Sequence, residues 1–278
     1  MRLGGPAMDK WRDPEDWARA VKALGYGAAY CPASADDSDE LLAAYAAAAK
    51  AADIVLAEVG AWSNPISPDE PTRAAAVAHC KAQLALAERI GARCCVNIAG
   101  SRGPTWDGPG EDNLTDETFE RIVQCVRDII DSVGPTRTYY TLETMPWSYP
   151  DSADNYVRLI RAIDREAFAV HFDPVNLVCS PQIYYRTGEM IRDFVAKLGP
   201  RIRSGHAKDI SLSLRLTTHL DEVRPGLGGL DYRTFLTELD RLEADVPLML
   251  EHLSTADEYA QAAAHIRSVA DEAGVTLR

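Results

Sequence analysis

The sequence predicts a single parallel (β/α)8 barrel, an α/β fold, and three observations support it. Short segments of β-type residues alternate with longer helical segments from one end of the chain to the other. The chain has 278 residues, near the roughly 250 of a one-domain barrel, and 46% are hydrophobic, enough for a full core. No linker or change of composition divides it, so residues 1–278 are expected to form one domain. A doubly wound open sheet is the alternative.

Eight segments are expected to form the strands of this barrel. In chain order they are residues 2–4, 28–31, 53–59, 93–99, 138–144, 167–173, 201–208 and 247–253. Eight alternating units with short connections favour a closed barrel, since an open sheet of that size more often has a second domain or an unpaired strand. In a barrel, function belongs to the C-terminal strand ends and the loops that follow them.

A helical pattern follows each predicted strand. The eight patterns cover residues 13–24, 38–51, 70–90, 115–132, 152–163, 185–198, 231–243 and 255–273. Two of them open with capping residues, since Thr115 precedes three polar residues and Ser254–Thr255 precedes Asp257 and Glu258. The Ala-rich run 41–52 also favours a helix, because Ala has the highest helix propensity.

The composition disfavours several classes of partner. The formal net charge of −13 would repel a nucleic-acid backbone or an anionic membrane. The N-terminus has no basic segment followed by an apolar one, and no run reaches the roughly 18 apolar residues of a membrane span. Six cysteines without a C-x-x-C pair resemble the buried thiols of a reducing compartment. We therefore expect a cytoplasmic protein without a nucleic-acid or membrane partner; a homo-oligomer is compatible with the sequence.

Polar residues stand near the ends of the last four predicted strands. They are Glu143 in YYTLETMPW, Asp173 in VHFDPVN, His206 in SGHAKD and Glu251 in LMLEHL. Successive members are one β/α unit apart, the last interval being lengthened by a loop insertion, so inward side chains would converge at the barrel mouth. Each one alone can equally be a capping residue or the partner of a loop Lys or Arg.

Three carboxylates at one point would repel one another, and a divalent cation resolves this. Three carboxylates and an imidazole form a hard, mostly oxygen site suited to Mn²⁺, Mg²⁺ or Co²⁺, with Zn²⁺ as a further alternative. We expect one divalent ion per chain, with Mn²⁺ as the first candidate.

Other candidates for substrate binding lie near the same strand ends. Lys208, two positions after His206, can neutralise an enolate oxygen or a phosphate, or pair with an acid. His171 lies one layer below Asp173 inside the barrel. A histidine at such a position more often hydrogen-bonds within the core than binds a ligand. Asn97 and Glu58, at the ends of strands four and three, can bind hydroxyls or hydrogen-bond the loops.

The loops that would rim the mouth are rich in tryptophan. An indole ring can stack on the C–H face of a sugar or anchor its loop, and we expect substrate contact from Trp62 and Trp147 in particular. The loop tryptophans are Trp11, Trp62, Trp106 and Trp147. The stretch 224–232, RPGLGGLDY, can bring backbone N–H groups to an anion or form an ordinary turn. The sequence is therefore compatible with a substrate that carries a phosphate and with one that does not.

The order E…DPVN…HAKD…GxGGLDY…LEH resembles the xylose isomerase-like barrels over about residues 138–252. These include sugar isomerases and epimerases, ketose 3-epimerases, inosose dehydratases and the related apurinic endonucleases. The resemblance implies that the two glutamates perform the proton transfers. It also implies four metal ligands: Glu143, Asp173, His206 and Glu251.

Two positions depart from the ketose 3-epimerase pattern. Those enzymes usually carry a substrate-binding His three residues after the strand-six Asp, where this chain has Asn176. Their glutamate six residues after the strand-five Glu is Tyr149 here. We expect Asn176 to contact the substrate. The two departures argue against assigning the chain to the ketose 3-epimerases in particular.

The first functional hypothesis is a metal-dependent isomerase or epimerase of a sugar, sugar phosphate or related polyol, acting through an enediolate. The alternative is a lyase or dehydratase that shares the first step on a keto-sugar, keto-glycoside or inosose and then expels a β-substituent. A nuclease is disfavoured, because the apurinic endonucleases need a His-rich zinc cluster and this chain has six His and a net charge of −13. A binding protein without activity would be expected to lack a ligand, and all four are present.

Overall fold

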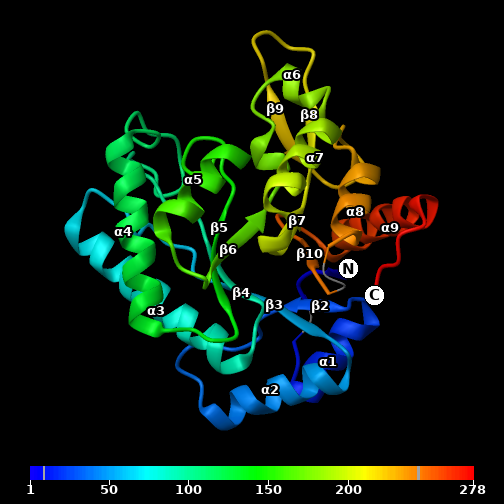
Figure 1. Cartoon of the computed structure of the whole chain (residues 1–278). Helices are drawn as coiled ribbons and strands as arrows, with labels where there is room; N and C mark the ends of the chain where they lie inside the picture. The colour runs from blue at the N-terminus through cyan, green and yellow to red at the C-terminus, as the bar shows by residue number, and fades with distance from the viewer. Residues whose placement is uncertain (9, 243–244) are drawn as a thin grey trace.

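Eight strands close into a parallel barrel in the order β1-β10-β7-β6-β5-β4-β3-β2 (Figure 1). The computed structural model describes residues 1–8, 10–242 and 245–278. The closed barrel confirms the predicted fold and excludes the open sheet. Each strand overlaps its predicted segment: β1 (Arg2–Gly4), β2 (Ala28–Tyr30), β3 (Val55–Gly60), β4 (Cys94–Asn97), β5 (Tyr139–Glu143), β6 (Phe168–Phe172), β7 (Ile202–Ala207) and β10 (Pro247–Leu250).

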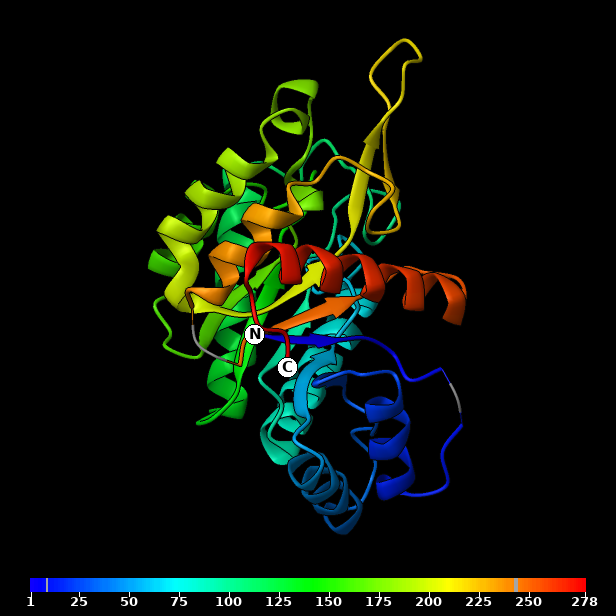
Figure 2. The same cartoon turned by 90° about the vertical axis from the view of Figure 1, so that its right-hand side faces the viewer.

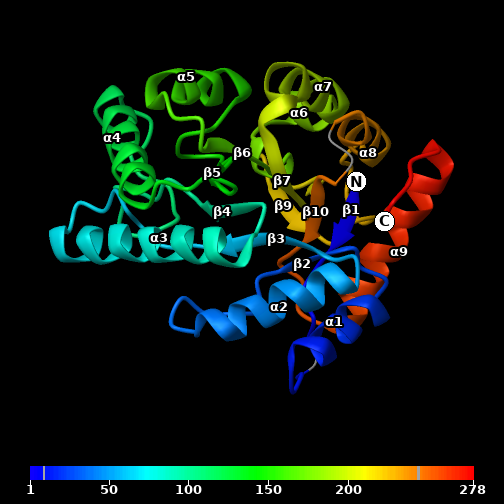
Figure 3. The same cartoon turned by 60° about the horizontal axis from the view of Figure 1, so that its bottom comes forward.

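Helices surround the strands on the outside of the barrel (Figure 3). They match the predicted patterns within a few residues: α1 (Pro14–Ala23), α2 (Asp39–Ala51), α3 (Glu70–Ile90), α4 (Asp116–Val133), α5 (Ala153–Ile163), α7 (Thr187–Leu198), α8 (Tyr232–Asp240) and α9 (Ala256–Ala273). The pattern 231–243 overran α8, and its last position lies outside the described residues. Thr115 caps α4 and Thr255 forms a capping box with Glu258, as expected. None of the described helices is long and apolar enough to cross a bilayer.

Tyr156 of α5 fixes the relative position of β5 and β6 from behind the barrel wall. Its buried hydroxyl contacts the carbonyl of Leu142 at 2.6 Å and that of Ala169 at 2.9 Å. The amide N–H groups of Leu142 and His171 point to the same oxygen at 3.3 Å. Because β5 and β6 pair in parallel with Glu143 opposite His171, this contact sets the register of two site strands.

Between β7 and α8 the chain forms a hairpin that the sequence analysis treated as a loop insertion. Strands β8 (Asp209–Leu212) and β9 (Leu220–Val223) pair antiparallel, and the hairpin projects beyond the barrel (Figure 2). Short helical segments were also not predicted: η1 (Val175–Leu177), α6 (Pro181–Tyr184) and η2 (Gly199–Arg201). All six cysteines are free.

Candidate metal centre

Four predicted site residues converge at the C-terminal ends of neighbouring strands. Glu143 ends β5, Asp173 follows β6, His206 lies in β7 and Glu251 follows β10. One nitrogen or carboxylate oxygen from each lies within 4.8 Å of those of the others. Because β5, β6, β7 and β10 are consecutive in the barrel, four positions far apart in sequence form one cluster, which we call the acid cluster.

Contacts within the acid cluster orient its members. His206 Nδ1 lies 3.1 Å from Glu143 Oε1 and 2.8 Å from Glu251 Oε1. Asp173 Oδ1 accepts hydrogen bonds from the amides of Val175 and Asn176, at 2.8 and 3.3 Å, where the chain turns into η1. The side-chain amide of Asn176 donates to Glu143 Oε1 at 3.1 Å. The turn after β6 therefore fixes one oxygen of Asp173 and leaves Oδ2 facing the other ligands.

Lys208 places its ammonium among these carboxylates. Its Nζ lies 2.5 Å from Glu251 Oε1, 2.9 Å from Asp173 Oδ2 and 3.7 Å from Glu143 Oε1. Its side chain is 3% exposed, so the charge is almost fully withdrawn from water. Lys208 therefore points to the same cluster as His206, as its spacing suggested, and pairs with several acids at once.

The acid cluster nevertheless carries more negative charge than its partners balance. Buried Asp173 Oδ2 and Glu251 Oε1 touch the Lys208 ammonium, but neither receives a hydrogen bond of good geometry from the described residues. Three carboxylates face one permanent cation when His206 is neutral, as a metal ligand must be. Oxygen-rich donors with unsatisfied buried oxygens fit a divalent ion.

Burial and mutual charge set the protonation of this cluster. Burial raises the pKa of Asp173 from 3.8 to about 6. Burial also opposes ionisation of Glu143 and Glu251, but His206 and Lys208 hold the pKa of both below the usual range. For His206 burial opposes the charged form, and the carboxylates of Glu251 and Glu143 raise its pKa well above the ordinary value. Shifts of this kind are typical of functional sites.

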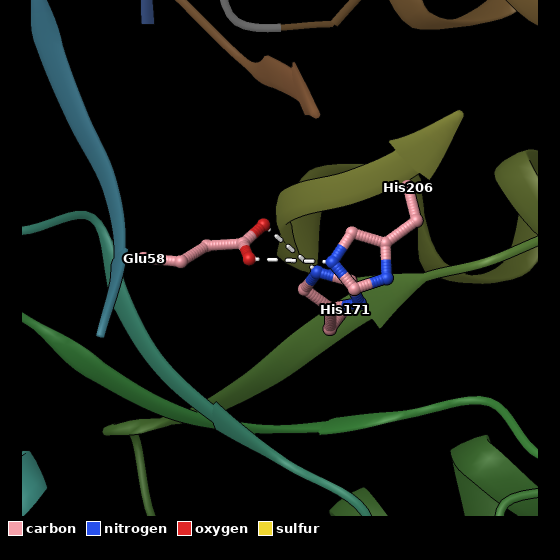
Figure 4. Close-up of side chains that lie close together, drawn as sticks. All are labelled: Glu58, His171 and His206. Carbon is pink, nitrogen blue, oxygen red and sulfur yellow. Dashed lines mark hydrogen bonds and ion pairs between the residues drawn. The ribbon is translucent and has the colours of Figure 1, made fainter. Parts of the chain in front are cut away.

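A second group of side chains, the deep layer, consists of Glu58, His171 and Ser204 and shares His206 with the acid cluster. Figure 4 shows Glu58 pointing toward the rings of His171 and His206. Glu58 Oε1 lies 2.9 Å from His171 Nε2 and also accepts from the Ser204 hydroxyl; Glu58 Oε2 lies 3.3 Å from His206 Nε2. The rings of His171 and His206 are 4.2 Å apart. Glu58 thus holds Nε2 of His206 and leaves Nδ1 facing the acid cluster, as the hydrogen-bond partners of metal-binding histidines do.

Three residues that the sequence suggested for substrate contact are buried behind the mouth. Glu58 and His171 belong to the deep layer and are 1% and 0% exposed. Asn97 is 0% exposed, accepts from the amide of Ser63 at 3.2 Å and contacts Cys80 Sγ at 3.3 Å. None of the three lines the cavity at the mouth. Glu58 and His171 contact other inward side chains one layer down in the packed barrel, whereas Asn97 contacts Cys80 of α3 on the helix side of β4. Direct substrate contact by these residues therefore has no support from their position.

A cavity of about 580 Å³ opens above the acid cluster. Its wall includes both tryptophans expected there, Trp62 and Trp147, and it is lined by Pro6, Tyr30, Trp62, Ile98, Trp106, Asp107, Glu143, Met145, Pro146, Trp147, Asn176, Lys208, Glu222, Glu251, His252 and Tyr259. Trp11 packs instead against the core and donates its indole N–H to Tyr45. A larger groove of about 980 Å³ between α3 and α4 contains none of the predicted site residues.

Several polar residues of this cavity were not recognised from the sequence: Tyr30, Asp107, Glu222, His252 and Tyr259. Glu222 of β9 contacts His252 Nδ1 at 3.1 Å and Lys208 Nζ at 3.5 Å. His252 Nε2 lies 3.6 Å from Glu251 Oε2. His252 directly follows the strand-eight ligand in LEH, a position that could have marked it. Glu222 gave no such signal, because the hairpin carrying it was not predicted.

The loop 224–232 does not present its amides to the cavity. The N–H groups of Gly226 and Gly228 donate to Asp209 Oδ2 at 2.9 and 3.0 Å, and that of Leu230 donates to Oδ1 at 3.0 Å. The expectation that this loop could cradle an anion is thus corrected: the chain's own carboxylate already occupies these donors.

The fold is similar to that of several solved structures. A xylose isomerase domain protein from Planctomyces limnophilus superposes with a TM-score of 0.67 at 19% identity, over 98% of this chain and 96% of its own. A D-psicose 3-epimerase from Clostridium cellulolyticum gives 0.69 at 16%, over 99% and 100%. Endonuclease IV from Thermus thermophilus gives 0.74 at 16%, over 98% and 100%. At these identities the likeness concerns the fold.

Sequence comparison points to the same group of proteins. No protein of curated function matches the chain. A family model described as "Xylose isomerase-like TIM barrel" matches residues 18–269, which include the acid cluster, the deep layer and both halves of the barrel. The chain therefore belongs to the xylose isomerase-like TIM barrel family.

Proposed function

We propose that this chain is a divalent-metal-dependent isomerase or epimerase that converts a sugar or related polyol through an enediolate. The observation that carries the proposal is the acid cluster, in which three carboxylates and one imidazole converge within 4.8 Å and two buried oxygens receive no hydrogen bond of good geometry from the described residues. Glu143, Asp173, His206 and Glu251 would hold the ion, with Mn²⁺ as the first candidate and Mg²⁺, Co²⁺ or Zn²⁺ as alternatives.

A divalent ion at this position supplies Lewis acidity toward a carbonyl oxygen and its neighbouring hydroxyl. The protein supplies the proton transfers. Glu143 on β5 and Glu251 after β10 reach the cluster from positions separated by β6 and β7. One carboxylate removes the proton next to the carbonyl. Return of a proton by the other from the opposite face gives epimerisation, whereas return by the same group to the neighbouring carbon gives isomerisation.

The other cavity residues would position the substrate. Asn176 donates to Glu143 and fixes the direction of that carboxylate. Lys208 would stabilise a developing enolate oxygen with its buried ammonium. Trp62 and Trp147 would contact the substrate from the side opposite the acids. The free thiols and the acidic net charge agree with a cytoplasmic enzyme for small carbohydrates that does not bind nucleic acid, and a homo-oligomer remains compatible.

Elimination is the second candidate, and one observation favours it. A lyase forms the same enolate and then needs an acid for the leaving β-substituent. His252 stands 3.6 Å from Glu251 on the cavity wall, and the hydrogen bond with Glu222 raises its pKa above the ordinary value. A partly protonated imidazole beside the proposed base can serve as that acid.

Incubation in D₂O tests the proposal. The protein is mixed with Mn²⁺ and keto-sugars, keto-glycosides or inososes, and the products are analysed by mass. We expect one deuterium at the carbon next to the carbonyl of a true substrate, without loss of water or of an aglycone. A dehydrated or cleaved product would identify the lyase. Turnover without any exchange would contradict the enolate route altogether.

A further inference from the structure

The cavity above the acid cluster has two unlike walls. The wall that follows β3, β4 and β5 presents three indole rings, Trp62, Trp106 and Trp147, each about two-fifths exposed at 43%, 41% and 39%. Ile98, Met145 and Pro146 extend this largely apolar wall, whose acidic lining residues are Asp107 and Glu143. The facing wall, from β7, the hairpin and β10, presents Lys208, Glu222, Glu251 and His252. A ligand that spans the cavity therefore needs a polar end and an apolar face.

Two of the three indole rings, those of Trp147 and Trp62, are held in place before any ligand binds. Trp147 donates its N–H to the carbonyl of Asp107 at 2.7 Å, which ties the loop after β5 to the loop after β4. The Trp62 ring lies against Gly60, where a Cβ would overlap its Nε1 atom. Its centroid is 6.3 Å from that of His206, so a ring stacked on Trp62 lies next to the acid cluster. Preformed aromatic surfaces bind flat apolar faces at low entropic cost.

The cavity offers little to a negatively charged substrate. Lys208 is the sole Lys or Arg among the described lining residues, and its ammonium lies at the acid cluster, 2.9 Å from Asp173 Oδ2 and 2.5 Å from Glu251 Oε1, rather than where a phosphate elsewhere in the cavity could pair with it. His252 is paired with Glu222. With a divalent ion bound, the ion and Lys208 together would just balance the three carboxylates of the acid cluster, so no excess positive charge is left for a phosphate. The glycine-rich loop has no spare amides for a phosphate, because Asp209 accepts from them.

The cavity is also larger than one sugar ring requires. Its volume is about 580 Å³. Even at the roughly 30 Å³ that a water molecule occupies in the liquid, the twelve heavy atoms of a hexose would take only about 360 Å³. The same cavity is lined by the tryptophans as well as by the acids, so a second ring in the remaining space can contact the indole rings.

We infer that the substrate is an uncharged glycoside, with its sugar ring over the acid cluster and a flat-faced aglycone, an aryl group or a second sugar ring, stacked on the wall formed by Trp62, Trp106 and Trp147. This deepens the proposed function and rests on it for the chemistry. The binding preference itself does not depend on turnover, since the apolar wall is present whatever reaction follows.

Calorimetric titration of the protein in Mg²⁺ buffer tests the inference with five probes: phenyl β-D-glucopyranoside, cellobiose, methyl β-D-glucopyranoside, D-fructose and D-fructose 6-phosphate. We expect phenyl glucoside, cellobiose or both to bind about tenfold more tightly than methyl glucoside, as burial and stacking of an added ring predict. The stronger of the two identifies the aglycone class. Fructose 6-phosphate should bind no more tightly than fructose.

Variants assign the preference to the wall. Trp62→Ala and Trp106→Ala should each reduce the ratio of phenyl to methyl glucoside affinity by about threefold or more, with the melting temperature checked by circular dichroism. Trp11→Ala, a loop tryptophan outside the cavity lining, is the matched control and should keep the ratio.

Equal affinity for phenyl glucoside, cellobiose and methyl glucoside, including no binding by any of them, would overturn the inference, as would tighter binding of the phosphate. A retained preference without deuterium exchange on any keto-glycoside would instead count against the proposed reaction and leave the substrate class standing.

Discussion

The deep layer and the acid cluster share His206 but differ in how their charges are satisfied. In the deep layer both oxygens of Glu58 are paired, and although burial opposes ionisation, His171 and His206 lower the pKa of Glu58 below its usual range. In the acid cluster, Asp173 Oδ2 and Glu251 Oε1 have no hydrogen bonds from the described residues although both atoms are buried.

The two layers also differ in access. The deep layer lies inside the packed barrel, whereas Glu143 and Glu251 line the cavity. An enclosed carboxylate with hydrogen-bond partners, such as Glu58, is suited to orienting a metal ligand. A group of carboxylates that is open to the cavity and has oxygens without hydrogen bonds is suited to binding an exchangeable ion. His171 and Glu58 can also be grouped as candidate metal ligands with His206, but Glu58 is already engaged by three partners, His171 and Ser204 at Oε1 and His206 at Oε2. The difference between the layers predicts different outcomes for matched substitutions.

The largest expected effect is on metal content. His206→Ala should lose stoichiometric metal, because it removes the ligand shared by both layers, whereas His171→Ala should largely keep it. Elemental analysis of protein purified without chelator measures both. Metal retained by His206→Ala and lost by His171→Ala would reverse the roles of the two layers.

The next effect concerns the two glutamates. Glu143→Gln and Glu251→Gln should each lower turnover by a factor of about 10² or more, the usual contribution of a positioned acid or base. One of the two variants is expected to retain deuterium exchange, since a single base still forms the enolate. Mass analysis in D₂O then identifies the abstracting base. Full turnover by either variant with metal bound would refute the two-base scheme.

A smaller effect on metal affinity is expected from a substitution in the deep layer. Glu58→Gln keeps the shape of the deep layer but removes the charge that faces His206 Nε2, and it should weaken metal binding by about 10- to 100-fold. Competition with a chelator of known affinity measures the change. Asn97→Asp, behind the wall and outside both layers, serves as the control for a buried charge change. Unaltered affinity in Glu58→Gln would separate the deep layer from the metal.

The smallest effect is on the stability of the metal-free protein as a function of pH. Burial raises the pKa of Asp173 from 3.8 to about 6, so between these values the folded state holds a proton that the unfolded chain releases. Stability from this group should fall as pH rises from about 4 to 7, by at most about 3 kcal/mol. The raised pKa of His206 acts in the same direction above pH 6.5.

Urea unfolding of chelator-treated protein at pH 5 and pH 7 measures this dependence. Asp173→Asn cannot titrate, so its stability should change less between the two values than that of the original protein. An equal change in the free energy of unfolding of both proteins would show that the proton on Asp173 does not contribute to the pH dependence of stability.

The barrel and the acid cluster could be predicted from the order of residues along the chain. The β/α alternation fixes where each strand ends, and in a closed parallel barrel the C-terminal ends of neighbouring strands must meet at one mouth. Glu143, Asp173, His206 and Glu251 therefore follow from their strand positions alone. The location of Trp62 and Trp147 at the mouth follows from the same geometry, because loops after strands rim that end.

Only the folded structure showed which polar groups face the cavity and which already have partners within the protein. Strand alternation places Glu58 and His171 inward but does not say that they bond to each other across the barrel, 113 positions apart in sequence. The amides of loop 224–232 look free in the sequence until Asp209 is seen to accept from them. Glu222 reaches the cavity only because an antiparallel hairpin folds over it. These outcomes depend on distances between segments far apart along the chain, and local periodicity carries no information about such distances.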